Sequence, residues 1–270
     1  MRISTKMVVF LAGLGTACAI GSPPMLVPTT WAATLPKPAI SEEAGAAVAQ
    51  MGKSLLARQF SVKVTTLRVY AEASGQPLHI AHSMKITVRR PDRLRVDLTG
   101  DDGATELVYD GKTVVLMGLE TKKYATVPVP ATIQGMLETV VGKNGVDFPL
   151  ADLLTDAPDK AFLLGVTSGR EVGTATIDGV QCRHLLFTQP PGIEIELWVE
   201  QNDRAIPRRL IITYRSQPGQ PSFIAAFSDW DFSVHPADAE FAFQPPDGAV
   251  RTELMAPTQP AASGQKGSGR

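Results

Sequence analysis

The stretch from residue 179 to residue 214 constrains the fold most, because it holds three strand-like runs separated by two turns. The first run, Val180–Thr188, ends at Pro190-Pro191-Gly192, since proline cannot donate to a sheet ladder and glycine accepts positive φ. The second run, Ile193–Glu200, alternates aliphatic with mainly acidic residues, so that one face of the strand is apolar and the other polar. With a third run at Arg208–Arg215, the stretch predicts an antiparallel sheet with one dry and one wet face.

Similar patterns occupy the rest of the chain. Ser41, followed by Glu42 and Glu43, is typical of a helix start, and apolar residues at helical spacing continue this predicted helix over Ala44–Arg58. Two shorter helices are expected at Thr132–Val141 and Pro149–Leu154. Further strands are predicted at 60–70, 78–90, 94–98, 105–109, 113–117, 123–127, 162–177 and 222–232. The fold class is therefore mainly β (α+β), a strongly curved antiparallel half-barrel with helices capping its concave face.

Two local features of these strands are also predicted. The apolar positions of the run 60–70 change face between Val64 and Leu67, which indicates a bulge or a strong twist. Asp110-Gly111 between two short strands is typical of a type I′ hairpin turn.

The N-terminus resembles an export signal. Arg2 and Lys6 precede the short apolar run 7–20, so we assign residues 1–33 to a signal peptide cleaved after Ala19 or near Ala32. Residues 34–40 form a linker, residues 41–250 a single half-barrel domain, and residues 251–270 a low-complexity, disordered tail. The expected location is the periplasm. After cleavage the protein is not expected to be an integral membrane protein, and we expect a monomer.

Lipid attachment at Cys18 is an alternative to simple cleavage. It is disfavoured because the residue three positions earlier is Gly15 rather than a branched aliphatic residue.

Charge and motifs exclude several function classes. The chain has 26 basic and 27 acidic residues, a net charge of −1, which argues against a nucleic-acid partner. It has no glycine-rich phosphate loop, nucleophile elbow, paired Cys-x-x-Cys or HExxH motif, so we expect no cofactor, no metal and no enzymatic activity.

Some isolated residues could still carry chemistry. Cys182 and His184 share a strand face and could act as nucleophile and base, but packing is the favoured interpretation. His79 and His82 point to opposite faces of a strand and cannot share one metal ion. The acidic row Glu194, Glu196 and Glu200 is typical of a solvated face.

Arg90 is a candidate for a contact with the helices. It ends a strand beside Pro91, where its guanidinium could reach backbone carbonyls of a helical lid. The alternative is an ordinary surface arginine.

Two resemblances to known families rest on specific residues. The segments 179–185, 196–199 and 207–214 (GVQCRHL, ELWV and PRRLIITY) resemble a family of predicted periplasmic proteins with a domain of unknown function. Arg90-Pro91-Asp92-Arg93-Leu94 and 109–115 (YDGKTVV) resemble the outer-membrane lipoprotein carrier LolA and its receptor LolB. The second resemblance implies an open β-barrel capped by helices, an apolar cavity for acyl chains, and a lid-holding role for Arg90.

The favoured function is an exported binding protein that holds an acyl chain or another apolar ligand, with lipid or lipoprotein handling as its context. A curved sheet covered by apolar-faced helices encloses apolar surface of the kind such ligands need. The alternative is an envelope protein-interaction or stress-sensing module without an enclosed ligand. The residues expected to line the cavity are Val88, Val96, Leu116, Met136 and Leu137.

Overall fold

The computed structural model describes residues 39–72 and 74–254; the predicted signal peptide and most of the predicted tail lie outside these residues. The first helix, α1 (Glu42–Leu55), begins as predicted. Ser41 Oγ accepts a hydrogen bond from Ala44 N (3.2 Å), and Glu42 and Glu43 lie in the first turn, where negative charge is favourable.

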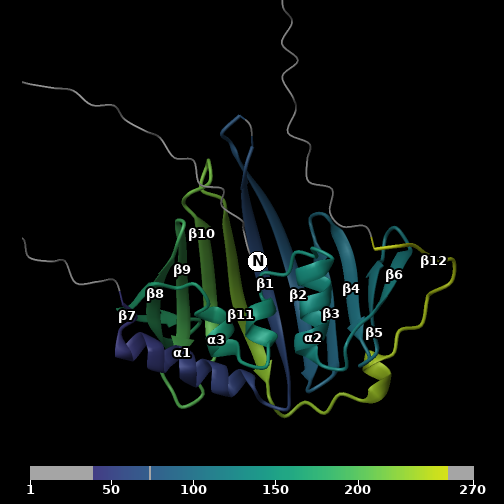
Figure 1. Ribbon diagram of the computed structural model, residues 1–270, viewed down its shortest axis with the longest axis horizontal. Coiled ribbons are helices and arrows are strands. Elements are labelled where there is room, and N and C mark those ends of the chain that lie inside the picture. Colours follow the sequence, from purple (N-terminus) through teal and green to yellow (C-terminus); the bar gives the residue numbers. More distant parts are fainter. Residues whose placement is uncertain (1–38, 73, 255–270) are drawn as a thin grey trace, which may run out of the picture. The chain divides into compact units, whose positions relative to one another are not determined.

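The strands form one open, curved sheet of twelve strands in the order β12-β6-β5-β4-β3-β2-β1-β11-β10-β9-β8-β7 (Figure 1). All neighbours pair antiparallel except β12 and β6, which are parallel. The strands are β1 (Gln59–Ala71), β2 (Pro77–Arg89), β3 (Arg93–Gly100), β4 (Gly103–Tyr109), β5 (Thr113–Gly118), β6 (Lys123–Pro128), β7 (Ser168–Ile177), β8 (Val180–Gln189), β9 (Ile193–Glu200), β10 (Pro207–Tyr214), β11 (Ser222–Asp231) and β12 (Val250–Arg251). The mainly β, curved antiparallel class predicted from the sequence is confirmed.

Short helices between β6 and β7 lie on the same face of the sheet as α1 (Figure 1). They are α2 (Ile133–Leu137), the π-helix η1 (Glu138–Lys143), the 3₁₀-helix η2 (Ala151–Leu154) and α3 (Pro158–Phe162). Their apolar residues and those of α1 share one buried cluster with the inner rows of the strands. We call residues 130–166 the lid segment.

The segment after β11 crosses to the other, convex face. It carries the 3₁₀-helix η3 (Asp238–Phe241), whose Phe241 is 1% exposed, and ends in β12 beside β6. We call residues 233–252 the strap. Because the strap covers part of the convex face, this face is not uniformly wet as the sequence pattern suggested.

The first and last residues that the structure describes lie at the two edges of the sheet. β12 pairs with β6 at one edge. At the other, Ser41 N donates to Gly169 O of β7 (2.8 Å), and Gly169 N donates to Ala39 O (3.2 Å). The sheet thus includes Arg251, beyond the domain boundary expected at residue 250.

Three local predictions are wrong. The segment predicted as strand from Phe162 is helical at first, and β7 begins only at Ser168. β1 pairs with β2 without a register shift, and its irregularity against β11 lies between Ser61 and Lys63 rather than near Leu67. In the hairpin after Tyr109, Gly111 has a φ of 91° but Asp110 has no positive φ, which a type I′ turn at these two residues would require.

Candidate functional site

The concave face of the sheet and the lid segment enclose the apolar cluster in which the predicted lining residues lie. Val88 and Met136 are fully buried, Leu137 and Val96 are 5% and 6% exposed, and Leu116 is partly buried against the same cluster. The structure therefore brings all five together. All five belong to the buried apolar cluster or pack against it, under the lid segment.

Strand register explains why the residues from the sheet share this face. Val96 lies opposite Ile86 on β2 and Leu107 on β4, and Leu107 lies opposite Leu116 on β5. Residues directly opposite in a ladder point to the same side, so this row runs across four strands. Met136 and Leu137 of α2 belong to the same buried cluster.

Arg90 fastens the lid segment and α1 to one end of the sheet. Its Nη2 donates to Leu55 O at the end of α1 (3.2 Å) and to Leu154 O at the end of η2 (3.0 Å). Its Nη1 lies 3.3 Å from Asp156 Oδ1. The side chain is 10% exposed, and its Nε has no partner among the described residues. Burial lowers the pKa of Arg90 and Asp156 opposes this shift, but a guanidinium keeps its charge in proteins.

Two further hydrogen bonds hold the lid segment at this end. Ile133 N donates to Pro91 O (2.8 Å), and Tyr109 Oη donates to Pro130 O (2.6 Å). Burial, followed by nearby charges, raises the pKa of Tyr109 to about 12, so its hydroxyl stays protonated as a donor. This end of the lid segment is therefore attached by several polar contacts.

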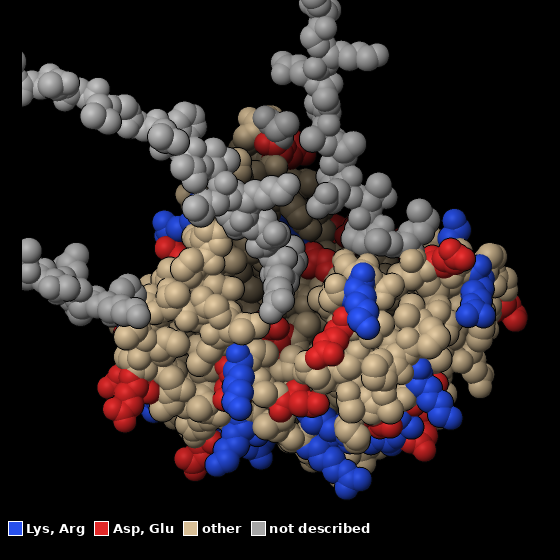
Figure 2. Space-filling model, viewed as in Figure 1, with Lys and Arg blue, Asp and Glu red and all other residues tan. Residues whose placement is uncertain are grey.

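At the opposite end the lid segment is held by an ion pair between Asp147 and Arg68 of β1. Here the strands extend beyond the helices (Figure 1), and inner-face residues such as Ile80, Leu98 and Ile212 are only partly buried. On the face seen in Figure 2, charged side chains gather along the end where the helices lie, over the lower rim. The strand end near Arg68 is thus the more accessible side of the apolar cluster.

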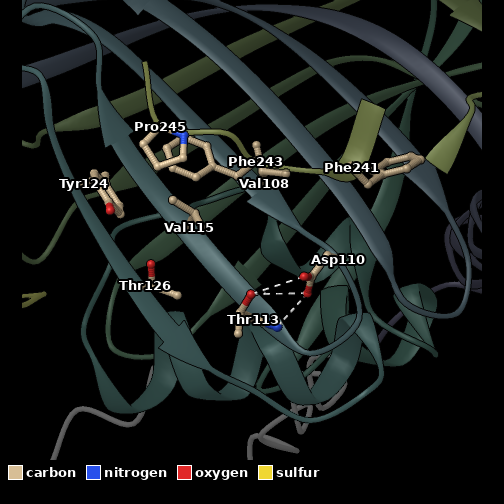
Figure 3. Close-up of a pocket in the computed structure, with 9 residues that line it drawn as sticks. All are labelled: Val108, Asp110, Thr113, Val115, Tyr124, Thr126, Phe241, Phe243 and Pro245. Atoms are coloured by element: carbon tan, nitrogen blue, oxygen red, sulfur yellow. Dashed lines mark hydrogen bonds between the residues drawn. The ribbon is translucent and has the colours of Figure 1, made fainter. Parts of the chain in front are cut away.

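A hollow of about 260 Å³ lies on the convex face between β4, β5, β6 and the strap (Figure 3). Its wall includes Tyr124 and Phe243, whose rings lie 5.3 Å apart. Asp110 faces it, but the carboxylate already accepts hydrogen bonds from Lys112 N (2.8 Å) and Thr113 N (2.7 Å). Burial raises the pKa of Asp110, and these hydrogen bonds outweigh burial, so that the net shift is downward. Asp110 is thus a turn-stabilising carboxylate rather than an acid or base.

The other predicted candidates do not assemble a catalytic site. Cys182 is fully buried, and burial, followed by the charge of Glu200, raises the pKa of its thiol, whereas a nucleophilic thiol needs a lowered pKa. His184 stacks on Trp198 (4.0 Å between ring centroids) and pairs with Glu196 (2.8 Å).

The predicted pair of histidines on β2 is placed as expected. His79 and His82 lie on opposite faces of β2, and His82 pairs with Asp102 (2.6 Å). Within residues 39–72 and 74–254, no three His, Cys, Asp or Glu side chains are grouped to hold a metal ion.

The acidic row of β9 is less solvated than predicted. Glu194 pairs with Arg215 in a partly exposed position (2.6 Å). Glu200 is 6% exposed and binds Arg208 (Oε1 to Nη2, 2.5 Å) and Asn202 (Oε2 to Nδ2, 2.6 Å). The reason is that the turn after β9, which includes buried Ala205 and Ile206, covers the end of this strand.

Two residues were missed by the sequence analysis, Arg68 and Asp147. The sequence did contain a signal for Arg68: it is a basic residue that alternates onto the same face of β1 as the apolar residues Phe60, Val62 and Val64. Asp147 had no comparable signal, because only the fold brings the loop after η1 to β1.

Similarity to solved structures is low in sequence. An uncharacterized conserved protein from Thermus thermophilus has 12% identity and a TM-score of 0.48, over 78% of this chain and 99% of that one. The Mycobacterium tuberculosis lipoprotein LppX has 19% identity and a TM-score of 0.44, over 72% and 99% of the two chains. A LolA superfamily protein from Nitrosomonas europaea has 11% identity and a TM-score of 0.38, over 74% and 97%.

No curated protein matches the chain. Among the residues that the structure describes, no helix has the length and apolar character needed to cross a membrane. A family model matches residues 44–255, most of the chain, and its description agrees with the periplasmic location predicted from the sequence. The chain therefore belongs to the family of predicted periplasmic proteins designated DUF2092.

Proposed function

We propose that this protein is a non-enzymatic periplasmic binding protein that holds an acyl chain or similar apolar ligand between the concave face and the lid segment. The observation that carries the proposal is the unequal attachment of the lid segment over a continuous apolar surface. Arg90, Pro91 and Tyr109 hold one end, whereas the Arg68–Asp147 ion pair holds the other.

The lid segment is also built in a way that permits movement. α3 has five residues, and α2 continues directly into η1, so that the two end at Lys143; helices this short depend on packing rather than on their own hydrogen bonds. Breaking the Arg68–Asp147 ion pair and lifting this end of the lid segment would open the row that contains Val96 and Leu116. Apolar side chains line such sites in proteins, and only a few polar groups are needed.

Mass spectrometry of an organic extract tests this proposal directly. The protein is purified from the periplasm without detergent and extracted before and after incubation with lipids. A fatty acid, phospholipid or lipopeptide in stoichiometric amount is the expected result. A clean extract under both conditions would overturn the proposal.

A matched pair of variants locates the ligand. Leu116→Asn places an amide on the concave face. Val115→Asn places the same group one residue earlier on β5, where the side chain lines the convex hollow. Loss of the bound ligand from the Leu116→Asn protein alone is expected. Loss from Val115→Asn alone would place the ligand in the convex hollow instead.

One observation favours a second candidate, an envelope protein-interaction or stress-sensing module. Tyr70 and Leu78 lie opposite each other near the tip of the β1–β2 hairpin and are 43% and 44% exposed. This hairpin projects beyond its neighbours (Figure 1). A photoreactive side chain at Leu78 would then cross-link one partner in cells, whereas the same group at exposed Val172 would not.

A further inference from the structure

Arg68 occupies an unusual position for a basic residue in this sheet. It lies opposite Ile80 on β2 and Phe223 on β11, in the row that faces the lid segment. The other lysines and arginines of β1, β2, β3 and β11 alternate onto the convex face; they are Lys63, Lys85, Arg89, Arg93 and Arg95. A positive charge at the margin of the apolar surface therefore needs an explanation.

The protein covers the Arg68 side chain but leaves its partner in solvent. The side chain is 19% exposed and its guanidinium lies over the Phe223 ring, 5.4 Å from the centroid. Asp147, which neutralises it, is 68% exposed. Ion pairs with a solvent-exposed partner contribute little to stability, because water and salt compete for the charges. Asp147 is therefore a counter-ion that another anion can replace.

Two tyrosines accompany this arginine on the same face. Tyr70 follows Arg68 by two residues on β1, and Tyr214 lies on β10 in the same row as Ile212. Burial, followed by the charge of Asp147, raises the pKa of Tyr214. Its hydroxyl thus remains protonated and can donate a hydrogen bond to an anionic oxygen.

We propose that Arg68 binds the anionic head group, a carboxylate or a phosphate, of an amphiphile whose chain lies under the lid segment. This inference rests on the proposed function and specifies its ligand class. The head group would take the place of Asp147 on Arg68. Since Asp147 belongs to the lid segment, the exchange would free the lid at this end while Arg90 holds the other.

The test compares three ligands with the same twelve-carbon chain: dodecanoate, dodecyl phosphate and dodecanol. Their affinities for the delipidated protein are measured by titration calorimetry. A charge-assisted hydrogen bond to the guanidinium should make at least one anion bind about tenfold tighter than the alcohol. The tighter of the two anions then identifies the head group as carboxylate or phosphate.

Variants assign this preference to Arg68. Arg68→Gln should bring the anion within about twofold of the alcohol and leave dodecanol binding unchanged, while Asp147→Asn should strengthen anion binding about threefold or more. Lys63→Gln and Asp229→Asn break an ion pair between β1 and β11 on the convex face, and they should leave the affinities for the anion and the alcohol unchanged.

Each remaining outcome is decisive. Equal affinity for all three ligands, or an anion preference that survives Arg68→Gln, would overturn the head-group site and leave the proposed function standing. Binding of no ligand would overturn the proposed function and the head-group site with it.

Discussion

At the residue scale, burial decides how much an ion pair contributes to the stability of the fold. Glu200 and Glu194 lie on the same face of β9 and each binds one arginine, but the Glu200 side chain is 7% exposed and that of Glu194 is 33% exposed. A charge lost from a buried pair leaves its partner poorly solvated, whereas an exposed pair exchanges its contacts for water. The two glutamates therefore provide a comparison within one strand.

Glu200→Gln should lower the free energy of unfolding by about 2 kcal/mol or more, because Arg208 keeps its covered position without a carboxylate. Glu194→Gln should change it by less than about 0.5 kcal/mol. Urea unfolding followed by tryptophan fluorescence measures both. Equal losses would show that the burial difference has no energetic role.

Asp110 predicts a pH effect. Its pKa in the folded protein is lower than the ordinary value of 3.8, so its contribution to stability is complete above that value and is lost as the pH falls through the folded pKa. Asp110→Asn keeps an oxygen that can accept from Lys112 N and Thr113 N but cannot titrate. The variant should therefore lose less stability than the native protein in this acid range in thermal melts at stepped pH. If the melting temperatures of the two proteins fell in parallel with pH, Asp110 would not be the source of the acid sensitivity.

At the element scale, the three predicted helices are present and most predicted strands are confirmed, and the main error is a predicted strand that begins with a helix. Alternation of apolar residues identified the strands on both sides of the Ile193–Glu200 run and placed Val88 and Val96 on the inner face correctly. The apolar run after Phe162 was assigned to a strand, because a short apolar run does not distinguish a strand from a buried helix. The Arg68–Asp147 contact joins residues 79 positions apart, so local patterns could not reveal it.

The strap is an element whose anchoring can be tested. Phe241 is almost fully buried and lies under the Arg89 guanidinium (5.2 Å), while Phe243 is partly exposed. Phe241→Ala should lower the free energy of unfolding, of the strap alone or of the whole domain, by about 3–5 kcal/mol. Hydrogen exchange at the amides of Val250 and Thr252 should become faster. Phe243→Ala should have a smaller effect. Unchanged exchange at these amides in the Phe241→Ala protein would mean that β12 is held independently.

At the scale of the whole molecule, the arrangement is a curved sheet whose covering segments attach at different ends. Arg90 contacts the ends of both α1 and η2, so one side chain joins two parts of the concave cover that are about 100 residues apart in sequence. The fold class and the position of Arg90 beside Pro91 were accessible from the sequence. Its carbonyl partners were not, because they depend on how the helices pack.

Arg90→Met should destabilise the protein by about 2–4 kcal/mol, since the carbonyls of Leu55 and Leu154 lose a buried donor. Arg93→Met removes an arginine three residues away, on the convex face, and serves as the control. Denaturant unfolding gives the difference between them. Similar losses for both variants would argue against a special role of Arg90 in holding the cover.

The partial cover of both sheet edges bears on whether the protein aggregates at high concentration. An unpaired edge strand can recruit the edge of another molecule and begin aggregation. Here residues 39–41 cover part of β7, and β12 covers part of β6. The two ends of the folded region therefore hinder pairing of these edge strands with another molecule. Ending the chain after residue 249 would uncover β6, and light scattering of the shortened protein should rise with concentration while the native protein stays clear.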